Sequence, residues 1–255
     1  MRFFTARLLE SQDLGGAFSW LRLAGCSALA ASRPGQFVMV RGAWGRDPLL
    51  PRAYSVLWAS GDEAELLVHR VGRGSNLLAA ARPGDAVTVL GPLGSVFPPP
   101  AAGELDMLVA GGCGVAPLYF AARRGERGSF ELLVGARTAA ELVLLDRLAD
   151  AGVVAHVATE DGTRGMRGLV TDLLGRRLAE GSRRAARILA CGPEGMLLAV
   201  REVARQHRLP CLLSVEAPMA CGVGACLGCA VPARGQPYRY VCQDGPVFDA
   251  EEVWP

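Results

Sequence analysis

The sequence has no lysine, so all 27 residues counted as lysine or arginine are arginines. These arginines are scattered among 25 acidic residues, which leaves a net charge of +2 and no basic cluster. A nucleic-acid-binding surface needs clustered positive charge. We therefore interpret the absence of lysine as coding bias, and we expect no nucleic-acid partner.

Long apolar runs are also absent. The chain has no stretch of about 18 apolar residues that would form a membrane span. Its first residues, Met1 to Glu10, lack the uninterrupted apolar segment of a signal peptide. We therefore expect a cytoplasmic protein with no membrane partner. In that reducing compartment its eight cysteines are not expected to form a disulfide framework.

Four cysteines gather in one segment with a specific spacing, Cys221-x4-Cys226-x2-Cys229-x12-Cys242. This spacing matches the plant-type pattern in which four thiolates hold a [2Fe–2S] cluster. Small residues between the first three cysteines allow backbone N–H groups to approach the cluster sulfides. The sequence therefore predicts that Cys221, Cys226, Cys229 and Cys242 are the cluster ligands and that the chain carries single electrons.

The alternative for this segment is structural zinc. Zinc sites favour two close pairs of cysteines, whereas here the second pair is separated by twelve residues. The remaining cysteines are scattered, and we expect each to be a small buried hydrophobe. These are Cys26, Cys113, Cys191 and Cys211.

The 255 residues predict two compact domains and a small third one. Residues 1–97 contain short β-prone runs between turns, which is typical of an antiparallel β-barrel. Residues 98–211 open on a stiff proline-rich linker and then alternate apolar strands with helices, which predicts a doubly wound parallel α/β sheet. Residues 212–255 hold the cysteine cluster and have little apolar bulk, so we expect the metal to organise them.

The expected elements follow from these runs. We expect barrel strands at 18–23, 36–41, 53–58, 65–71 and 86–90. We expect sheet strands at 105–110, 130–134, 153–158 and 186–190, and helices at 118–124, 139–149, 170–178 and 195–207.

The barrel segment carries the residue types that bind a flavin nucleotide, in Arg52-Ala53-Tyr54-Ser55. Arg52 offers a guanidinium for a phosphate, Tyr54 a ring that can stack on the isoalloxazine, and Ser55 a hydroxyl for a flavin heteroatom. Arg52 and Tyr54 share one face of the strand. The motif predicts a flavin site in the barrel.

A second barrel segment, Val68-His69-Arg70, leads into a glycine turn that ends at Gly74-Ser75 and offers a pyrophosphate cradle. His69 has no cysteine or carboxylate nearby in sequence, so we expect it to line the flavin pocket rather than to transfer protons. The alternative for this segment is a hairpin with a solvated arginine face.

Two small-residue turns follow strands of the predicted parallel sheet. Ligands of such sheets bind at the carboxyl ends of strands, and helix N-termini favour a pyrophosphate. The turns therefore predict a dinucleotide site, with Cys191 at its lip near the nicotinamide. Its residues are Gly111, Gly112, Gly114, Cys191, Gly192 and Pro193. The alternative is tight packing without a ligand, with Cys191 buried at the end of its strand.

The nucleotide is expected to be NAD rather than NADP. A 2′-phosphate needs a local cluster of basic residues after the second strand of the sheet. This chain has a single arginine there, Arg137, followed by the acid Glu141.

The order of these motifs resembles, over nearly the whole chain, the electron-transfer subunits of type B dihydroorotate dehydrogenase. The matching motifs are Arg52-x-Tyr54-Ser55, Gly72-Arg-Gly74-Ser75, Gly91-Pro-Leu-Gly94, Gly111 to Pro117, Cys191-Gly-Pro193 and the cysteine cluster. The resemblance implies a ferredoxin-reductase-like flavoprotein with FAD in the barrel, NAD on the sheet and the cluster near the flavin.

The same resemblance implies a partner, an FMN-containing dihydroorotate dehydrogenase catalytic subunit in a heterotetramer. Electrons would pass from that FMN through the cluster and FAD to NAD+, in pyrimidine biosynthesis, with no catalytic acid or triad. The chain departs from the family at Ala53 and Tyr54, where proline and an aliphatic residue are usual, and is closer there to general ferredoxin reductases. This departure keeps open a NAD(P)H–FAD reductase subunit of another complex, of the ferredoxin-NADP, hydrogenase or glutamate synthase type.

Overall fold

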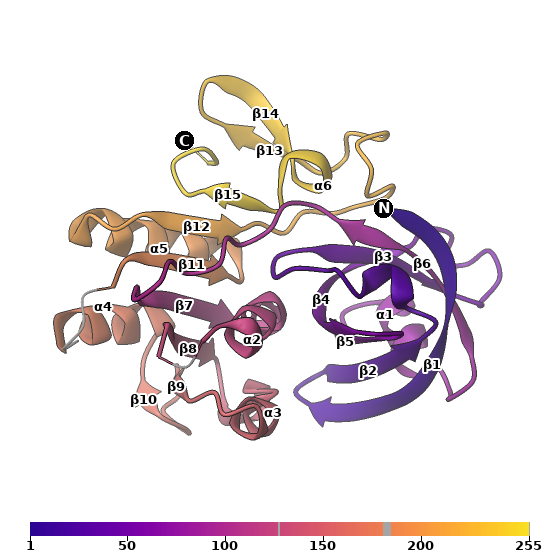
Figure 1. The fold of residues 1–255 in the computed structure, drawn as a ribbon, viewed down its shortest axis with the longest axis horizontal. Helices are drawn as coiled ribbons and strands as arrows, with labels where there is room; N and C mark the ends of the chain where they lie inside the picture. Colours follow the sequence, from indigo (N-terminus) through magenta and orange to yellow (C-terminus); the bar gives the residue numbers. More distant parts are fainter. Residues whose placement is uncertain (127, 181–184, 255) are drawn as a thin grey trace.

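The computed structural model describes residues 1–126, 128–180 and 185–254, which form a β-barrel beside an α/β sheet (Figure 1). The barrel is closed, in the strand order β1-β2-β5-β4-β3-β6. Its strands are β1 (Arg2–Gly15), β2 (Phe18–Ala24), β3 (Phe37–Gly42), β4 (Arg52–Ser60), β5 (Glu63–His69) and β6 (Ala86–Leu93). Between them lie η1 (Ser27–Leu29) and α1 (Arg73–Ala79).

Alternation of apolar and polar residues builds this barrel. Along β6 every second residue points inward, and Val87 and Val89 are buried in the interior. The long strand β1 was not expected, because only Ala6 and Leu8 along it are buried. Strand β1 pairs with both β2 and β6 and closes the barrel, which removes the free sheet edges.

The second body is a seven-stranded sheet in the order β10-β9-β8-β7-β11-β12-β15. All of its pairings are parallel except that of β15 on β12. Its strands are β7 (Asp106–Gly111), β8 (Phe130–Ala136), β9 (Ala155–Thr159), β10 (Met166–Arg167), β11 (Arg187–Cys191), β12 (Cys211–Ser214) and β15 (Val247–Asp249). Its helical segments are η2 (Gly112–Gly114), α2 (Val115–Arg124), η3 (Ala139–Glu141), α3 (Leu145–Asp150), α4 (Val170–Glu180) and α5 (Glu194–His207).

The strand order places a ligand site. From β7 the chain adds β8, β9 and β10 on one side, then returns to place β11 on the other side of β7. This reversal is a topological switch point, where open α/β sheets bind ligands. The two glycine turns predicted to hold a dinucleotide both leave the sheet at this point, one after β7 and one after β11. The predicted fold class is confirmed.

One sequence expectation needs correction. Residues 139–149 were expected to form one helix, but the chain forms η3 and then α3, with Leu144 between them in the left-handed conformation at φ 68°. The expected boundary between residues 211 and 212 falls inside β12, because the last segment adds β12 and β15 to the sheet. The three domain ranges themselves stay predictions.

The remaining C-terminal elements, β13 (Ala230–Ala233), β14 (Gln236–Tyr240) and α6 (Val241–Asp244), lie above the sheet and the barrel (Figure 1). The proline-rich linker between the two large bodies is fixed by Arg187, which pairs with the buried Asp106 at 2.8 Å and donates to the carbonyl oxygens of Pro98 and Pro99. This contact ties the linker to the start of the sheet.

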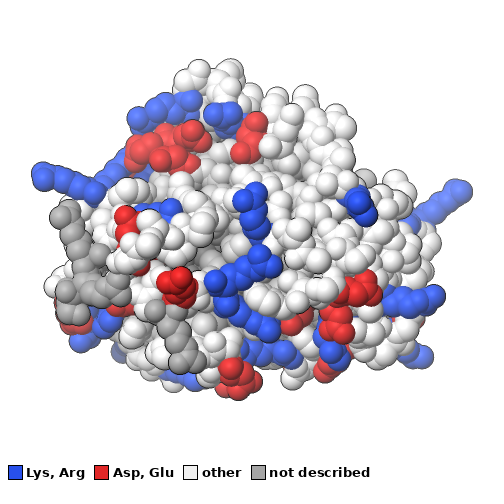
Figure 2. Space-filling view, viewed as in Figure 1, with Lys and Arg blue, Asp and Glu red and all other residues white. Residues whose placement is uncertain are grey.

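Over the face of the molecule shown in Figure 2, many arginines lie beside acids, and a run of arginines crosses the middle of the face. Many of them pair with each other, as Arg205 does with Glu251 at 2.7 Å. Within the described residues, no helix combines the length and the apolar character that crossing a membrane requires.

Candidate functional site

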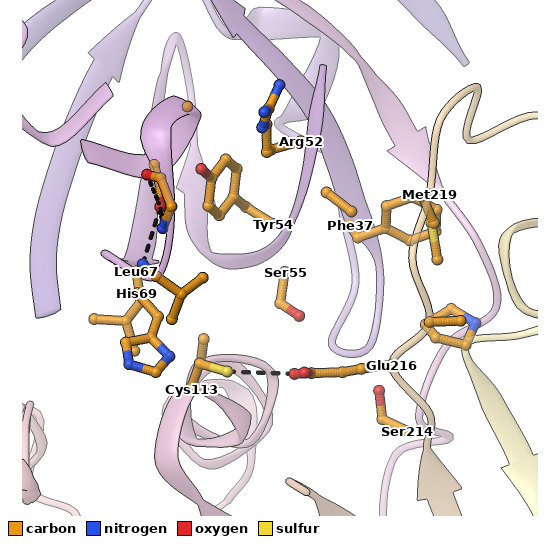
Figure 3. Close-up of a pocket in the computed structure, with 18 of the residues that line it drawn as sticks. Phe37, Arg52, Tyr54, Ser55, Leu67, His69, Cys113, Ser214, Glu216 and Met219 are labelled. Carbon is orange, nitrogen blue, oxygen red and sulfur yellow. Dashed lines mark hydrogen bonds between the residues drawn. The ribbon is translucent and has the colours of Figure 1, made fainter. Parts of the chain in front are cut away.

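A cavity of 350 Å³ lies where the barrel, the sheet and the C-terminal segment meet (Figure 3). Strand β4 contributes Arg52 to Ser55, and the end of β5 contributes Leu67 and His69. The glycine turn after β7 contributes Cys113. The segment that follows β12 contributes Glu216 and Met219, so the site is assembled from parts that are far apart in sequence.

Tyr54 carries a polar atom that needs a partner. Its phenolic hydroxyl is buried and makes no hydrogen bond to any described residue, and burial raises its pKa to about 12. A buried polar group without a partner costs about 1–3 kcal/mol. Tyr54 lines the cavity, but this hydroxyl oxygen is closed off from it, so the cavity offers a bound flavin nucleotide the Tyr54 ring rather than its hydroxyl.

Arg52 and Gly74 fit each other closely. A Cβ atom placed on Gly74 would lie 2.4 Å from the Arg52 Nε, so any larger residue there would displace the guanidinium from its present position. Arg52 has a hydrogen bond to the backbone oxygen of Leu50 and lines the cavity together with the glycine turn. A guanidinium and small-residue backbone on one wall suit a pyrophosphate.

The other predicted flavin residues divide into two groups. Ala53, Ser55, His69, Gly74 and Ser75 line the cavity, although the Ser75 hydroxyl is engaged with the turn itself and donates to the Gly72 carbonyl oxygen at 2.9 Å. Val68 and Arg70 do not line it.

The side chain of Val68 is fully buried in the barrel core. Arg70 is held by Asp13 at 3.0 Å and by Ser19 at 2.8 Å. The geometry of Val68 and Arg70 adds no support to their assignment as flavin contacts, which stays a prediction.

Cys113 and Glu216 form a pair in the wall of this cavity (Figure 3). The Cys113 thiol donates a hydrogen bond to a Glu216 oxygen at 3.4 Å, and the Ser55 hydroxyl points toward the pair. Burial by the surrounding protein raises the pKa of Cys113 to about 12. Burial also raises the pKa of Glu216, although its side chain is exposed to the cavity.

Cys113 was expected to be a buried hydrophobe and is instead half-buried, because the turn after β7 presents its thiol to the cavity. Sequence reasoning missed Glu216, which belongs to no motif and reaches the site only through the position of β12.

A second cavity of 700 Å³ lies at the switch point of the sheet. Gly111, Gly112 and Pro193 line it, as predicted for the dinucleotide site. Gly114 and Gly192 do not line it. Their lack of a side chain instead lets neighbouring segments pack closely. A Cβ on Gly114 would lie 2.0 Å from the Cys191 carbonyl oxygen, and one on Gly192 would lie 2.5 Å from the Met196 Cε.

Cys191 does not lie at the lip of either cavity, which corrects the expected position. Its side chain is 1% exposed and packs in the core that also contains Ala110 and Val115. The turn at Gly114 also packs directly on its carbonyl group. Burial raises the pKa of the Cys191 thiol well above its usual value. The alternative interpretation of this residue, a buried cysteine at the end of a strand, describes its position.

The far end of the second cavity is lined by Arg137, Glu141 and Glu160. The Arg137 guanidinium is bonded to the Glu141 carboxylate at 2.5 and 3.2 Å. This ion pair lowers the pKa of Glu141. Because the single arginine lies among two acids, these three residues form no basic cluster.

The four cysteines of the predicted cluster meet in pairs. The sulfur atoms of Cys229 and Cys242 are 3.3 Å apart, and Cys221 and Cys226 also interact through their side chains. Backbone N–H groups lower the pKa of Cys221 to about 6, which favours the thiolate that a metal binds.

No three metal-ligating side chains within the described residues gather close enough to share one ion. Two pairs of thiols suit a [2Fe–2S] cluster, because its four cysteine ligands are divided between two irons.

Comparison with known proteins agrees with this architecture. Residues 216–254 match the family model described as the iron–sulfur cluster binding domain of dihydroorotate dehydrogenase B, and residues 108–202 match an oxidoreductase NAD-binding domain. A Bacillus caldolyticus protein, named as the electron transfer subunit of dihydroorotate dehydrogenase B (NAD(+)), is 41% identical over 241 residues, which is 91% of each chain. The chain belongs to the family of dihydroorotate dehydrogenase B electron transfer subunits.

A Clostridium acetobutylicum protein with the same name is 34% identical over 221 residues, covering 87% of this chain and 86% of its own. The fold is also that of an NADH-dependent reduced ferredoxin-NADP oxidoreductase, with a TM-score of 0.85 and 27% identity over 98% of this chain and 89% of the other. These findings confirm the predicted family and the predicted cofactors, FAD, a [2Fe–2S] cluster and NAD.

Proposed function

We propose that this chain is the electron-transfer subunit of an NAD-dependent dihydroorotate dehydrogenase in pyrimidine biosynthesis. It passes electrons from the FMN of a catalytic partner through its [2Fe–2S] cluster and FAD to NAD+. The observation that carries this proposal is the position of the flavin cavity. The cluster segment forms one wall of that cavity, through Met219 and Pro246, and the dinucleotide cavity begins at His69 on another side.

Each group has a distinct redox chemistry when bound: nicotinamide takes two electrons, the cluster takes one at a time, and flavin does both. The three sites lie in the order that this chemistry needs, with the flavin cavity between the cluster segment and the dinucleotide cavity. Met219 lines the flavin cavity and lies two residues before the ligand Cys221. Gly222 packs on the barrel so closely that a Cβ atom there would lie 2.5 Å from the Met39 Cγ. The loop that carries Cys221, Cys226 and Cys229, called the cluster loop below, therefore rests against the barrel next to the flavin cavity.

Features of the cluster loop support a protein partner. Cys226 is exposed, and Val223 and Leu227 beside it are 41% and 51% exposed. Exposed apolar side chains around a redox centre suit docking by another subunit. We propose that this partner is the FMN-containing catalytic subunit, in a heterotetramer. We also propose that the complex works in the cytoplasm, where the four cysteines outside the cluster would remain reduced.

A second candidate is a reductase subunit of another complex. The observation that favours it is the likeness over nearly the whole chain to the ferredoxin-NADP oxidoreductase structure. The deciding experiment mixes purified chain with a purified FMN-containing dihydroorotate dehydrogenase subunit. We expect dihydroorotate-dependent reduction of NAD+ only when both are present. Reduction of ferredoxin by NADH with the chain alone, and no reaction with dihydroorotate, would establish the second candidate instead.

NAD is expected to be preferred over NADP by at least about ten-fold in kcat/KM, because Glu141 and Glu160 would repel a 2′-phosphate. Glu141→Ala frees Arg137 to meet that phosphate and should raise kcat/KM for NADPH in a dye-reduction assay. Glu180→Ala is the matched control, since Glu180 is also in an i,i+4 pair with an arginine, Arg176. Equal values for NADH and NADPH in the unmodified protein would contradict the prediction.

A further inference from the structure

The two cavities share one lining residue, His69. It is the last residue of β5, and it lines both the flavin cavity and the dinucleotide cavity. Electron transfer as a hydride requires the two reacting rings to lie about 3–3.5 Å apart. A flavin in one cavity and a nicotinamide in the other must therefore meet at the place that His69 borders.

The His69 ring is held in a fixed plane by Phe18. The two rings are stacked, with centroids 4.5 Å apart and an angle of 15° between their planes. The stack follows from the register of the barrel, because Phe18 on β2 lies directly opposite His69 on β5. Phe18 is 3% exposed and belongs to the core that also contains Trp20 and Leu57. A core side chain therefore sets the orientation of the imidazole.

The opposite side of this border is the glycine turn after β7. Gly112 lines the dinucleotide cavity, and the next residue, Cys113, lines the flavin cavity. This turn, η2, contacts β5. Gly112 has φ 55°, a left-handed conformation that glycine adopts readily. His69 on the barrel and the Gly112–Cys113 peptide on the sheet therefore both border the two cavities.

We propose that His69 is a positioning residue for NAD. Its ring, held by Phe18, provides a flat surface that aligns the nicotinamide with the flavin where the two cavities meet. This inference rests on the proposed function, since it needs both nucleotides. Within the described residues the imidazole has no side-chain hydrogen-bond partner, and acids stand on both sides, Glu216 at the flavin cavity and Glu141 at the dinucleotide cavity. The role assigned here belongs to the ring itself and not to its protonation.

The experiment compares His69→Ala with His69→Phe, because phenylalanine keeps a planar ring opposite Phe18 and removes the nitrogens. Both proteins are saturated with FAD and, in the oxidised state, titrated with a tetrahydro analogue of NADH that cannot donate a hydride. The readouts are the Kd of the dinucleotide and the long-wavelength absorbance that a nicotinamide gives when it lies on a flavin. A ring contact of this kind is worth about three- to ten-fold in affinity. We expect His69→Ala to weaken binding by that factor and to lose the absorbance.

His69→Phe should keep the absorbance and bind within about three-fold of the unmodified protein. The control is His156→Ala, a histidine on β9 that lies 4.0 Å from Glu131 and lines neither cavity. The proposal is overturned if His69→Ala behaves like the unmodified protein, or if His69→Phe is as impaired as His69→Ala. Absence of the absorbance from the unmodified protein would instead count against the proposed function.

Discussion

Cys226→Ser is expected to abolish the [2Fe–2S] cluster, with iron and acid-labile sulfide per chain falling close to zero. In a cluster with four cysteine ligands, two thiolates bind each iron, so this substitution removes one of the two thiolates from one iron. A serine hydroxyl at neutral pH is a poor replacement for a thiolate. Cys226 is exposed, so the smaller hydroxyl leaves no cavity in a packed core. Loss of the cluster is then a direct effect of the ligand and not of misfolding. The measurement is iron and sulfide content of purified protein.

Cys211→Ser is the control for this change. Cys211 lies on β12, is 6% exposed and belongs to the core of the sheet rather than to the cluster loop. The variant should keep its iron even if it is less stable to heat. Because Met219 and Pro246 of the cluster segment line the flavin cavity, Cys226→Ser should also retain less FAD than Cys211→Ser. Normal iron content in Cys226→Ser would contradict the ligand assignment.

The parts of the fold that the sequence predicts are those encoded by nearby residues. The cysteine spacing lies within 22 residues, and the rhythm of strands and helices repeats every few residues, so both can be recognised without a structure. Strand β1 escaped prediction because only Ala6 and Leu8 carry its inward face, and a barrel strand with so little apolar alternation has no local signal.

The candidate site is less predictable because at least four separate segments build it. Tyr54 and Arg52 can be assigned from their own motif, whereas Glu216 reaches the flavin cavity only because β12 joins the sheet beside β11. Cys191 is the opposite case, a residue that its local sequence wrongly places at a cavity. Its motif is that of a ligand-binding turn, but its side chain packs in the core that also contains Ala110 and Val115. Long-range pairing of strands decides both positions.

Arg52→Ala is expected to lower the affinity for FAD by about ten- to a hundred-fold, so that the protein purifies with much less flavin. A charge-assisted hydrogen bond to a phosphate contributes about 1.5–3 kcal/mol, which corresponds to that range. Arg52 lines the cavity beside the glycine turn, where a pyrophosphate would lie. Flavin released on denaturation, measured per chain, gives the occupancy. Iron content should fall less, because the cluster is held by its own thiolates.

Gly74→Ala tests the same contact without removing the charge. A Cβ atom at this position would lie 2.4 Å from the Arg52 Nε, and the guanidinium must move away to admit it, since the helical backbone accepts alanine. We expect Gly74→Ala to lose FAD in the same direction as Arg52→Ala while remaining folded. Arg22→Ala is the matched control, because Arg22 is a barrel arginine in surface ion pairs with Glu10 and Glu63. Full FAD occupancy in a folded Arg52→Ala protein would show that the guanidinium does not hold the phosphate.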